Sequence, residues 1–460
     1  MTELDLTILR TQVEGPVLTP GDPGYAVETA TYNLLTPMAP AVVVGAATLN
    51  DVQCAVHFAA EHGLAVAVRG GGHLQPRTGA GQLALTLDRM TSVEIDPVAE
   101  TVRVTGSPRW TEVIDAAVPH GLAPVSGSTG TTGVVGYLLG GGMSPILGRS
   151  YGYGSDHITE IEIVTADGVH RTCSPTTEPD LFEMLRGSKG NAGVVVAMTF
   201  SLIPLVGPVT AGGVWFAGER AAEVLPVWRD WAQTLPESAT TSVAIQRLPA
   251  LSDIPYPIRG AFVVHVRFSS IGDPDDAAKW IMPIRELGAP LMDTVGDLPY
   301  AESWTIHADP QEPLPYLDRS MGLGALSDDT ITALLGQVGP GTGCDLVSVE
   351  LRVLGGALDR PPAAPDVVPT RGLPYQLFAF GVGGRELFEH NTRQLDGMID
   401  AVRPWDYGPK MVNFVSPEEG LTPAHLAAIY GPHLYERVVA LKERFDPHNM
   451  FRINHNLVAG

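Results

Sequence analysis

Two clusters of glycine constrain this chain more than any other feature of its sequence. The first follows an apolar run and has the sequence Val66-Ala67-Val68-Arg69-Gly70-Gly71-Gly72-His73. Glycine adopts positive φ at little cost and has no side chain, so the N–H groups of such a turn can converge on a pyrophosphate. The segment lacks both the Gly-Lys-Ser/Thr ending of a P-loop and the GxGxxG spacing of a dinucleotide fold. Taken alone, it also fits a tight turn with an incidental histidine.

The second cluster extends from Gly127 to Gly142 and combines many glycine, serine and threonine residues with aliphatic ones. Its aliphatic residues are Val134, Val135, Leu138 and Leu139. A flexible linker does not need side chains that favour burial, whereas a loop lining a long cofactor needs both small donors and apolar packing. The two clusters together predict a protein that brings its main chain close to a bound cofactor.

The length of the chain predicts more than one domain, because 460 residues exceed the ~250–300 over which a single hydrophobic core grows. Short apolar strands alternate with amphipathic helices over residues 1–205, whereas residues 206–405 contain more proline and longer helices. We predict an α+β fold with a two-part first domain at 1–205 and a second domain at 206–405 whose sheet is covered on one face. A C-terminal segment follows at 406–460.

The periodicity of apolar residues locates the individual elements. In the first domain we predict a helix after the N-cap Thr48, further helices at 110–118 and 180–185, and strands at 41–44, 64–68, 101–105, 160–165 and 194–202. Asp167-Gly168 predicts a hairpin turn after the fourth of these strands. Beyond residue 205 we predict strands at 261–268, 345–354 and 375–380, and helices at 221–235, 329–337, 387–402 and 435–445.

A formal net charge of −22 limits the partners of this chain. An acidic surface repels phosphate backbones and anionic lipids, so neither nucleic acid nor a membrane is expected as a partner. The cysteines Cys54, Cys173 and Cys344 form no CxxC pair and predict neither a disulfide scaffold nor a metal site. The first residues carry no basic and apolar signal segment, and no run of about 18 apolar residues follows, so we expect a cytoplasmic enzyme.

Further short blocks make the pattern specific. In chain order the blocks are Arg69-Gly70-Gly71-Gly72-His73, Leu139-Gly140-Gly141-Gly142, Tyr151-Gly152-Tyr153-Gly154-Ser155-Asp156, Val164-Thr165-Ala166-Asp167-Gly168, Asp180-Leu181-Phe182, Arg186-Gly187, Asn191-Ala192-Gly193-Val194-Val195 and Asp446-Pro447-His448-Asn449-Met450-Phe451. Together they resemble the berberine-bridge-enzyme-like branch of the vanillyl-alcohol-oxidase flavoproteins. The resemblance is good over residues 25–205 and 405–460 and weak between them.

The resemblance implies an FAD-binding domain of the p-cresol-methylhydroxylase type, made of two α+β halves. It also implies an α+β substrate domain whose antiparallel sheet lies over the isoalloxazine, and a C-terminal segment that returns to the flavin. His73 would form an 8α-histidyl bond to FAD. The residues that the resemblance places at the cofactor are Arg69, Gly70, Gly71, Gly72, His73, Gly127, Thr129, Gly130, Thr132, Gly133, Gly136, Tyr137, Gly140, Val195, Asn454 and Asn456.

The sequence departs from the family pattern in three places. Many relatives form a second flavin link through a cysteine, but Thr129 stands at that position, so we predict a single link. Leu74-Gln75-Pro76-Arg77 stands where relatives usually have serine and glycine, which puts the cofactor contacts just beyond His73 in question. Met411 stands where many relatives have a tyrosine base, and methionine cannot accept a proton.

Glu350 and Arg352 are the candidates to replace this base. Alternation along residues 346–354 puts both on one face of a strand with Ser348, and the aliphatic residues on the other face. With Gly355-Gly356-Ala357 they match a family block whose glutamate often faces the substrate. We predict that Glu350 transfers a proton or orients the substrate, with a pKa that burial raises and Arg352 lowers. A solvated Glu/Arg pair on an open sheet face is the alternative.

Tyr137 directly follows Gly136 and would lie near the flavin, where it could assist Glu350. The alternative is an ordinary packed aromatic residue, since a buried tyrosine hydroxyl needs a partner in either case. We interpret His157 and Cys54 as structural.

The predicted activity is that of an oxidase which removes a hydride from a small or medium organic molecule and passes the electrons to O2. By analogy with relatives, a specialised-metabolite intermediate is the expected substrate. A flavin-dependent cyclase or oxygenase is the alternative, because the usual tyrosine base is missing. A catalytically silent flavin-binding protein is disfavoured because the redox motif is intact. No particular oligomeric state is predicted.

Overall fold

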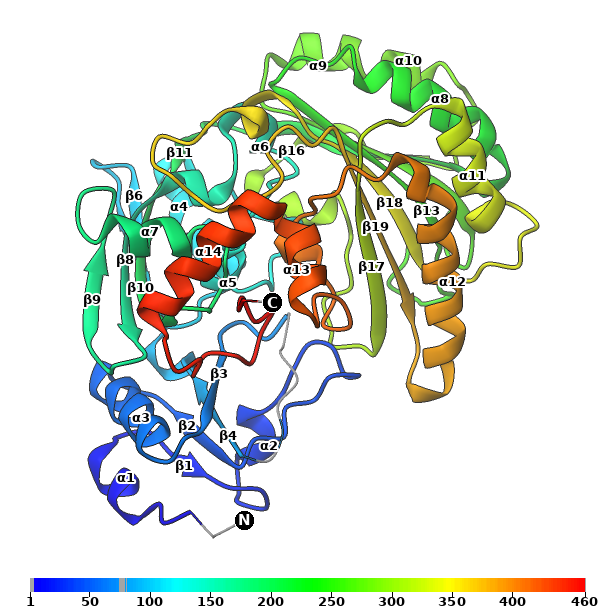
Figure 1. Cartoon of the computed structure of the whole chain (residues 1–460). Helices are drawn as coiled ribbons and strands as arrows, with labels where there is room; N and C mark the ends of the chain where they lie inside the picture. The colour runs from blue at the N-terminus through cyan, green and yellow to red at the C-terminus, as the bar shows by residue number, and fades with distance from the viewer. Residues whose placement is uncertain (1–3, 74–78, 80, 460) are drawn as a thin grey trace.

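The computed structural model describes residues 4–73, 79 and 81–459, which form two smaller sheets near the N-terminus and one large sheet beyond them (Figure 1). The predicted departure at Leu74-Gln75-Pro76-Arg77 lies outside the described residues. Across those residues, no helix combines the length and apolar character that crossing a membrane would require.

The first sheet carries the first glycine cluster at the end of one of its strands. Its order is β1 (Val17–Leu18), β2 (Val42–Gly45), β4 (Gln82–Thr86), β3 (Ala65–Arg69), with β2 and β3 parallel to β4. As predicted, α3 (Leu49–Glu61) begins after Thr48, whose side chain accepts a hydrogen bond from the Asp51 N–H. The strands β2 and β3, which α3 connects, run in the same direction. Their carboxyl ends therefore lie on the same side of the sheet, and the glycine turn begins there at Gly70. The short helix α1 (Thr7–Gln12) precedes β1, and the short helix α2 (Tyr25–Glu28) lies between β1 and β2 in the chain.

The second sheet is antiparallel and five-stranded. Its order is β5 (Ser92–Asp96), β6 (Thr101–Thr105), β10 (Gly193–Ser201), β8 (Ile158–Thr165), β9 (His170–Cys173). The predicted hairpin at Asp167-Gly168 joins β8 to β9. The elements beside this sheet are α4 (Trp110–Ala117), α5 (Val134–Leu139), α6 (Gly148–Tyr151), α7 (Pro179–Leu185) and the strand pair β7 (Leu122–Ala123) and β11 (Ile203–Pro204). The second glycine cluster contains α5.

The large sheet is antiparallel, with helices along its outer face (Figure 1). Its order is β15 (Met292–Asp293), β12 (Val209–Ala217), β14 (Phe262–Ser270), β13 (Ala239–Arg247), β18 (Ser348–Val353), β19 (Tyr375–Val382), β17 (Tyr316–Leu323), and β16 (Gly296–Leu298) also pairs with β12. The helices are α8 (Ala221–Ala232), α9 (Pro274–Trp280), α10 (Met282–Arg285), α11 (Asp328–Val338) and α12 (Phe388–Val402). Val349 and Leu351 of β18 pack into the core beneath these helices. The opposite, inner face of β18 therefore carries the polar side chains of this strand.

The C-terminal segment, α13 (Pro423–Tyr430) and α14 (Pro432–Phe445), returns to the N-terminal part of the chain. The Lys442 ammonium, almost fully buried, donates to Asp446 and to the carbonyl oxygens of Asn191 and Phe451. The Tyr430 hydroxyl donates to the Gly187 carbonyl at 2.9 Å. These bonds fix the last residues beside the loop that precedes β10.

The α+β class is confirmed, and most predicted elements lie within a few residues of those observed. Among the strands that the sequence missed are β12 and β17. Gly212-Gly213 interrupts the first of these strands, and Asp318-Arg319-Ser320 obscures the alternation of the second. Glycine and consecutive polar residues are depleted in strands, so tertiary pairing decides the structure of both segments.

Candidate active site

The two glycine clusters meet backbone to backbone at the end of β3. A Cβ atom on Gly71 would lie 2.5 Å from the Cα of Gly133, and one on Gly133 would lie 2.7 Å from the Cα of Gly71. Only glycine at both positions permits this approach. Nη1 of Arg109 holds the contact together, because it donates to the carbonyl oxygens of Gly71 and Thr131. His73 therefore lies beside the second cluster.

The imidazole of His73 is held on two sides. It stacks on Tyr32 with ring centroids 4.1 Å apart and planes 15° apart, and its Nε2 lies 3.2 Å from Oγ1 of Thr131. Burial and the positive charge of Arg109 lower the pKa of His73 to about 4, although Asp309 opposes them. At neutral pH the ring is uncharged, which is the form of imidazole that can act as a nucleophile.

Several groups around this contact are open to a neighbouring molecule. A Cβ atom on Gly70 or Gly136 would meet no heavy atom within 4 Å. Tyr137 Oη, Asn454 Oδ1 and Asn456 Oδ1 are buried and have no hydrogen-bond partner among the described residues. Buried polar atoms normally have partners, so these fit a long, polar cofactor such as FAD between the glycine clusters and the C-terminal segment.

Tyr137 is positioned by glycines on both sides of it in the second cluster. A Cβ atom on Gly127 would lie 2.8 Å from the Tyr137 ring, so this ring packs on bare main chain. Nδ2 of Asn413 donates to the Tyr137 carbonyl at 2.9 Å, and a Cβ atom on Gly140 would lie 2.0 Å from Oδ1 of Asn413. Gly127 and Gly140 thus shape the wall on which Tyr137 lies.

Four other predicted cofactor residues are engaged in local structure. The carbonyl oxygens of Gly130 and Thr132 accept hydrogen bonds from the first residues of α4. Nη1 of Arg69 lies 2.6 Å from Asp88, and the Val195 side chain belongs to the core around β10. Any contact that Arg69 or Val195 makes with a cofactor would therefore have to come from the main chain. Gly72, also predicted at the cofactor, accepts a hydrogen bond from the N–H of the residue that stacks on His73.

The inner face of the large sheet carries a buried group of charges, which we name the cleft network and define as Arg267, His307, Glu350 and Arg352. Nη1 of Arg267 donates to Oε1 of Glu350 at 2.8 Å, and Nη2 of Arg352 donates to Oε2 at 3.0 Å. Nε2 of His307 lies 3.3 Å from Oε1. Strand register explains the grouping, because Ser242 of β13 is directly opposite both arginines, on β14 and β18. Predicted alternation along β18 is confirmed, and the solvated Glu/Arg pair is excluded because both residues are at most 6% exposed.

The prediction for the pKa of Glu350 was incomplete. Burial alone raises this pKa, but Arg352, Arg267 and His307 together hold it well below the ordinary value. The carboxylate therefore stays ionised at neutral pH and is a weak proton acceptor. It remains a strong hydrogen-bond acceptor, which suits the orientation of a substrate better than the removal of a proton.

Met411 lies in an apolar cluster with Met143, Tyr153 and Leu373, and is 4% exposed. The Met411 thioether therefore makes apolar contacts at the position where many relatives have a tyrosine base. The predicted structural residues behave as expected: Nε2 of His157 lies 3.0 Å from the Tyr151 carbonyl oxygen.

Sequence reasoning missed Arg267, His307 and Asp309. Arg267 alternates with the aliphatic residues of a predicted strand, so the rule that identified Glu350 also applied to it. His307 and Asp309 follow a 3-10 helix in an irregular segment that offers no periodic signal. The side chains of Ser128 and Thr129 both donate to Oδ2 of Asp309 at 2.8 Å.

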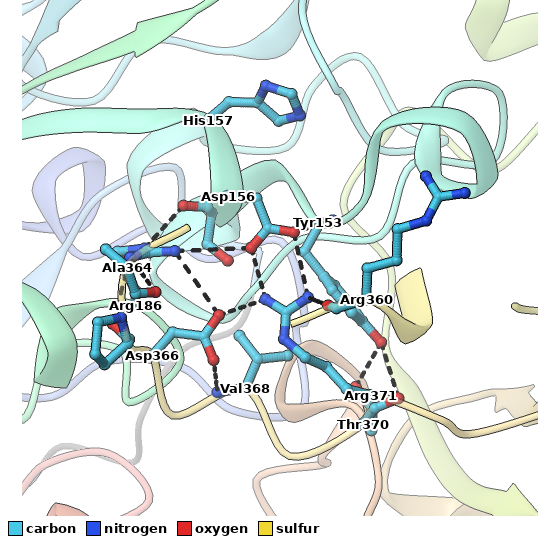
Figure 2. A network of polar contacts seen from close by, with 12 residues as sticks. Tyr153, Asp156, His157, Arg186, Arg360, Ala364, Asp366, Val368, Thr370 and Arg371 are labelled. Carbon is cyan, nitrogen blue, oxygen red and sulfur yellow. Dashed lines mark hydrogen bonds and ion pairs between the residues drawn. The ribbon is translucent and has the colours of Figure 1, made fainter. Parts of the chain in front are cut away.

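A second buried group of charges joins the N-terminal part to the segment between β18 and β19; we name Asp156, Arg186, Asp366 and Arg371 the junction network (Figure 2). Nη2 of Arg371 donates to Asp156 at 2.6 Å and also to Asp366. Nη2 of Arg186 lies 3.7 Å from Asp156 and 3.8 Å from Asp366. The two charges of each sign balance, which fits a structural connection.

Comparison with known proteins agrees with this geometry. Residues 40–174 match the family described as the FAD binding domain. The chain is 27% identical to (R)-6-hydroxynicotine oxidase of Paenarthrobacter nicotinovorans over 97% of both proteins. A crystal structure of 6-hydroxy-D-nicotine oxidase from Arthrobacter nicotinovorans superimposes with a TM-score of 0.85 and 25% identity over 99% of both chains.

Two more distant structures share the fold. BBE-like 1 of Physcomitrella patens superimposes with a TM-score of 0.82 at 19% identity over 98% of both chains. Glucooligosaccharide oxidase of Acremonium strictum, which carries a 6-S-cysteinyl, 8α-N1-histidyl FAD, superimposes with a TM-score of 0.83 at 20% identity over 97% of this chain and 98% of that one. Residues 40–174 thus form an FAD binding domain, and the relatives and structural neighbours of the whole chain are FAD-linked oxidoreductases of the berberine-bridge-enzyme-like type.

Proposed function

We propose that this enzyme holds FAD through a single 8α-histidyl bond at His73 and oxidises a small or medium organic molecule, with O2 as the electron acceptor. The observation that carries the proposal is the neutral, stacked imidazole of His73 at the contact between the two glycine clusters. FAD supplies the hydride acceptor, and the chain supplies binding and orientation.

The inner face of the large sheet supports a substrate with an apolar, planar part. Half-buried aromatic rings continue from Tyr316 to Phe380, Phe378 and Phe414, with neighbouring centroids 5.0 to 6.3 Å apart. Phe378 lies directly opposite Glu350 in the strand register. We expect the substrate to lie against these rings and to donate a hydrogen bond to the Glu350 carboxylate. A specialised-metabolite intermediate fits this description.

Tyr137 is the group that we expect to act beside Glu350. Its hydroxyl is buried without a partner among the described residues, and burial raises its pKa far above the ordinary value. The hydroxyl therefore keeps its proton at neutral pH and can only donate to, or accept from, a bound molecule. Arg352 remains a charged donor beside it, because Glu350 raises the Arg352 pKa against the effect of burial.

The test of the covalent link is acid precipitation of the purified protein. We expect the yellow colour to stay with the precipitated polypeptide, and His73→Ala to release the flavin or to yield apoprotein. Mass spectrometry of a tryptic digest should find FAD on the His73 peptide alone, since Thr129 cannot form a thioether. Free flavin in the wild-type supernatant would leave only tight binding.

The test of the reaction is the ratio of hydrogen peroxide to product. An oxidase forms one peroxide for each product molecule. Turnover without peroxide would favour the cyclase or oxygenase instead. That alternative is supported by Met411, which packs in an apolar cluster where many relatives have a tyrosine base.

A further inference from the structure

The strongest unassigned feature is the carboxylate of Asp309, which reaches the second glycine cluster from the opposite side of the cleft. Its Oδ2 accepts hydrogen bonds from both Ser128 and Thr129, at 2.8 Å each. No described residue donates a hydrogen bond to Oδ1. A negative charge is thus fixed at the position where doubly linked relatives have a cysteine.

The same segment encloses His73. The Tyr32 ring stacks on His73, and its hydroxyl donates to the carbonyl oxygen of Pro310, the residue after Asp309, at 2.5 Å. The N–H of Leu314 also donates to the carbonyl oxygen of Tyr32 at 3.1 Å. The segment that begins at Asp309 therefore packs along the residue that supports the imidazole.

The charge of Asp309 is maintained although the side chain is partly buried. Burial raises its pKa, but His307 and Arg267 lower it below the ordinary value, so it is a carboxylate at neutral pH. Asp309 in turn opposes the lowering of the His73 pKa by burial and by Arg109. The Asp309 carboxylate therefore favours the positively charged form of His73, whereas the Arg109 guanidinium disfavours it.

We propose that Asp309 is a positioning residue for formation of the covalent bond between His73 and FAD. The inference rests on the single histidyl link proposed above. When a neutral imidazole nitrogen bonds to carbon, the ring carries a positive charge until its N–H proton leaves. A fixed carboxylate in a buried site stabilises that charge as it develops.

The reaction balances with dioxygen as the oxidant. The new bond joins an imidazole nitrogen of His73 to the 8α carbon of FAD. The imidazole N–H bond and one C–H bond of the 8α methyl group break, and the isoalloxazine is reduced by the two electrons and takes up two protons. Dioxygen then reoxidises it and is reduced to hydrogen peroxide.

The experiment measures covalent attachment in the full-length chain, prepared as flavin-free protein and incubated with FAD in air. Flavin fluorescence of the denatured polypeptide gives the rate, and its dependence on FAD concentration separates binding from bond formation. Asp309→Asn retains an acceptor oxygen for Ser128 and Thr129 but removes the charge. We expect attachment at saturating FAD to slow roughly 10- to 100-fold, with little change in the concentration required.

Two further comparisons separate charge from structural support. Ser128→Ala removes one of the two hydrogen bonds to Oδ2 of Asp309 and keeps the charge, so we expect attachment within a few-fold of wild type. Asp309→Glu and Asp309→Gln have the same size as each other, and we expect only the glutamate to restore the rate. If Asp309→Asn fails to fold, the comparison of Asp309→Glu with Asp309→Gln tests the role of the negative charge instead.

Equal attachment rates for wild type and Asp309→Asn, or for the glutamate and glutamine variants, would overturn the role of Asp309. A Ser128→Ala protein as slow as Asp309→Asn would also overturn it, because Asp309 would then only anchor the loop. If wild-type protein releases all its flavin in acid, the proposed link itself fails, and this result is distinct from the others.

Discussion

The junction network and the cleft network are both buried, but they differ in how well their polar atoms are partnered. In the junction network Arg186 also donates to the carbonyl oxygens of Ser155, Ala364 and Pro365. Of the guanidinium nitrogens in this described network, Nε of Arg371 is the one that is fully buried without a hydrogen-bond partner. In the cleft network two arginines share the single carboxylate of Glu350. The first group is nearly complete without a ligand.

The cleft network and its immediate neighbours contain several buried polar atoms without a hydrogen-bond partner. Nε of Arg267 is buried without a hydrogen bond, as are both ring nitrogens of the adjacent His265 and Oγ1 of Thr240, within the part of the chain that the structure describes. An unpartnered buried donor costs free energy, so a fold retains several together where a ligand supplies the acceptors. This difference fits a structural role for the junction network and the substrate-orienting role that we propose for the cleft network.

The largest expected effect is on stability, from Arg186→Ala in the junction network. The substitution leaves Asp156 and Asp366 facing only one guanidinium in a buried site, so we expect a loss of about 3–5 kcal/mol in the free energy of unfolding. Chemical denaturation measures this loss. Flavin reduction by substrate in the folded enzyme should remain at the wild-type rate; a stable variant with slow reduction would reverse the assignment.

Asp318 sharpens the comparison, because it is a carboxyl group on the same inner face with no strong cationic partner. Burial raises its pKa to about 6. A group whose folded pKa exceeds its unfolded value binds a proton more tightly when folded, so its contribution is complete below about pH 4 and is lost as the pH rises through about 6. Ionised Asp318 therefore lowers stability at neutral pH.

We expect Asp318→Asn to be more stable than wild type by up to about 3 kcal/mol above pH 7, with the difference fading toward pH 4. Urea denaturation at pH 5 and pH 8 measures it. Glu350 serves as the opposite case, because its lowered pKa gives a contribution that is present above about pH 4.5 and is lost in acid. An Asp318→Asn advantage that is the same at both pH values would contradict the explanation.

Glu350→Gln tests the cleft network directly. The amide keeps the shape of the side chain but loses the charge that orients a substrate donor, so we expect anaerobic flavin reduction to slow about 100-fold. Stopped-flow measurement at the flavin absorbance gives the rate, and flavin content should not change. Arg186→Ala is the matched control, since it removes a buried charge outside the cleft. A wild-type rate for Glu350→Gln would make this residue structural.

The sequence could identify the face of β18 but not the charge balance on it. Alternation within one strand is a local property, so Glu350 and Arg352 were assigned to the right face. The pKa of Glu350 depends on Arg267, which reaches it from β14, two strands away in the sheet. Pairing at that range depends on the order of strands, which no local pattern specifies.

The same limit applies around His73. The glycine turn and the histidine are contiguous, so their pattern predicted the position of the cofactor. Tyr32, Arg109 and Asp309 come from three separate segments, and the contact of Asp309 with Thr129 joins residues 180 positions apart. Short motifs therefore indicate the candidate flavin site, whereas the groups that surround it depend on the fold.

The smallest expected effect distinguishes two buried tyrosines. The Tyr153 hydroxyl, beside the junction network, lies 2.8 Å from Oγ1 of Thr370 and donates to its carbonyl at 3.1 Å, whereas the Tyr137 hydroxyl has no partner among the described residues. Removing a partnered hydroxyl typically costs about 1 kcal/mol, so Tyr153→Phe should lower the free energy of unfolding by that amount. It should leave flavin reduction unchanged.

Tyr137→Phe should behave in the opposite way. In a flavin-free His73→Ala background we expect its stability to change by less than about 0.5 kcal/mol, since no hydrogen bond is lost and the edge-to-face contact with Trp110 is kept. In the flavin-loaded enzyme it should slow reduction and alter the visible spectrum. Denaturation and stopped-flow spectroscopy of the two variants measure both properties. If Tyr137→Phe loses as much stability as Tyr153→Phe without flavin, its hydroxyl has a partner in the protein, and the argument that unpartnered atoms mark the flavin site fails there.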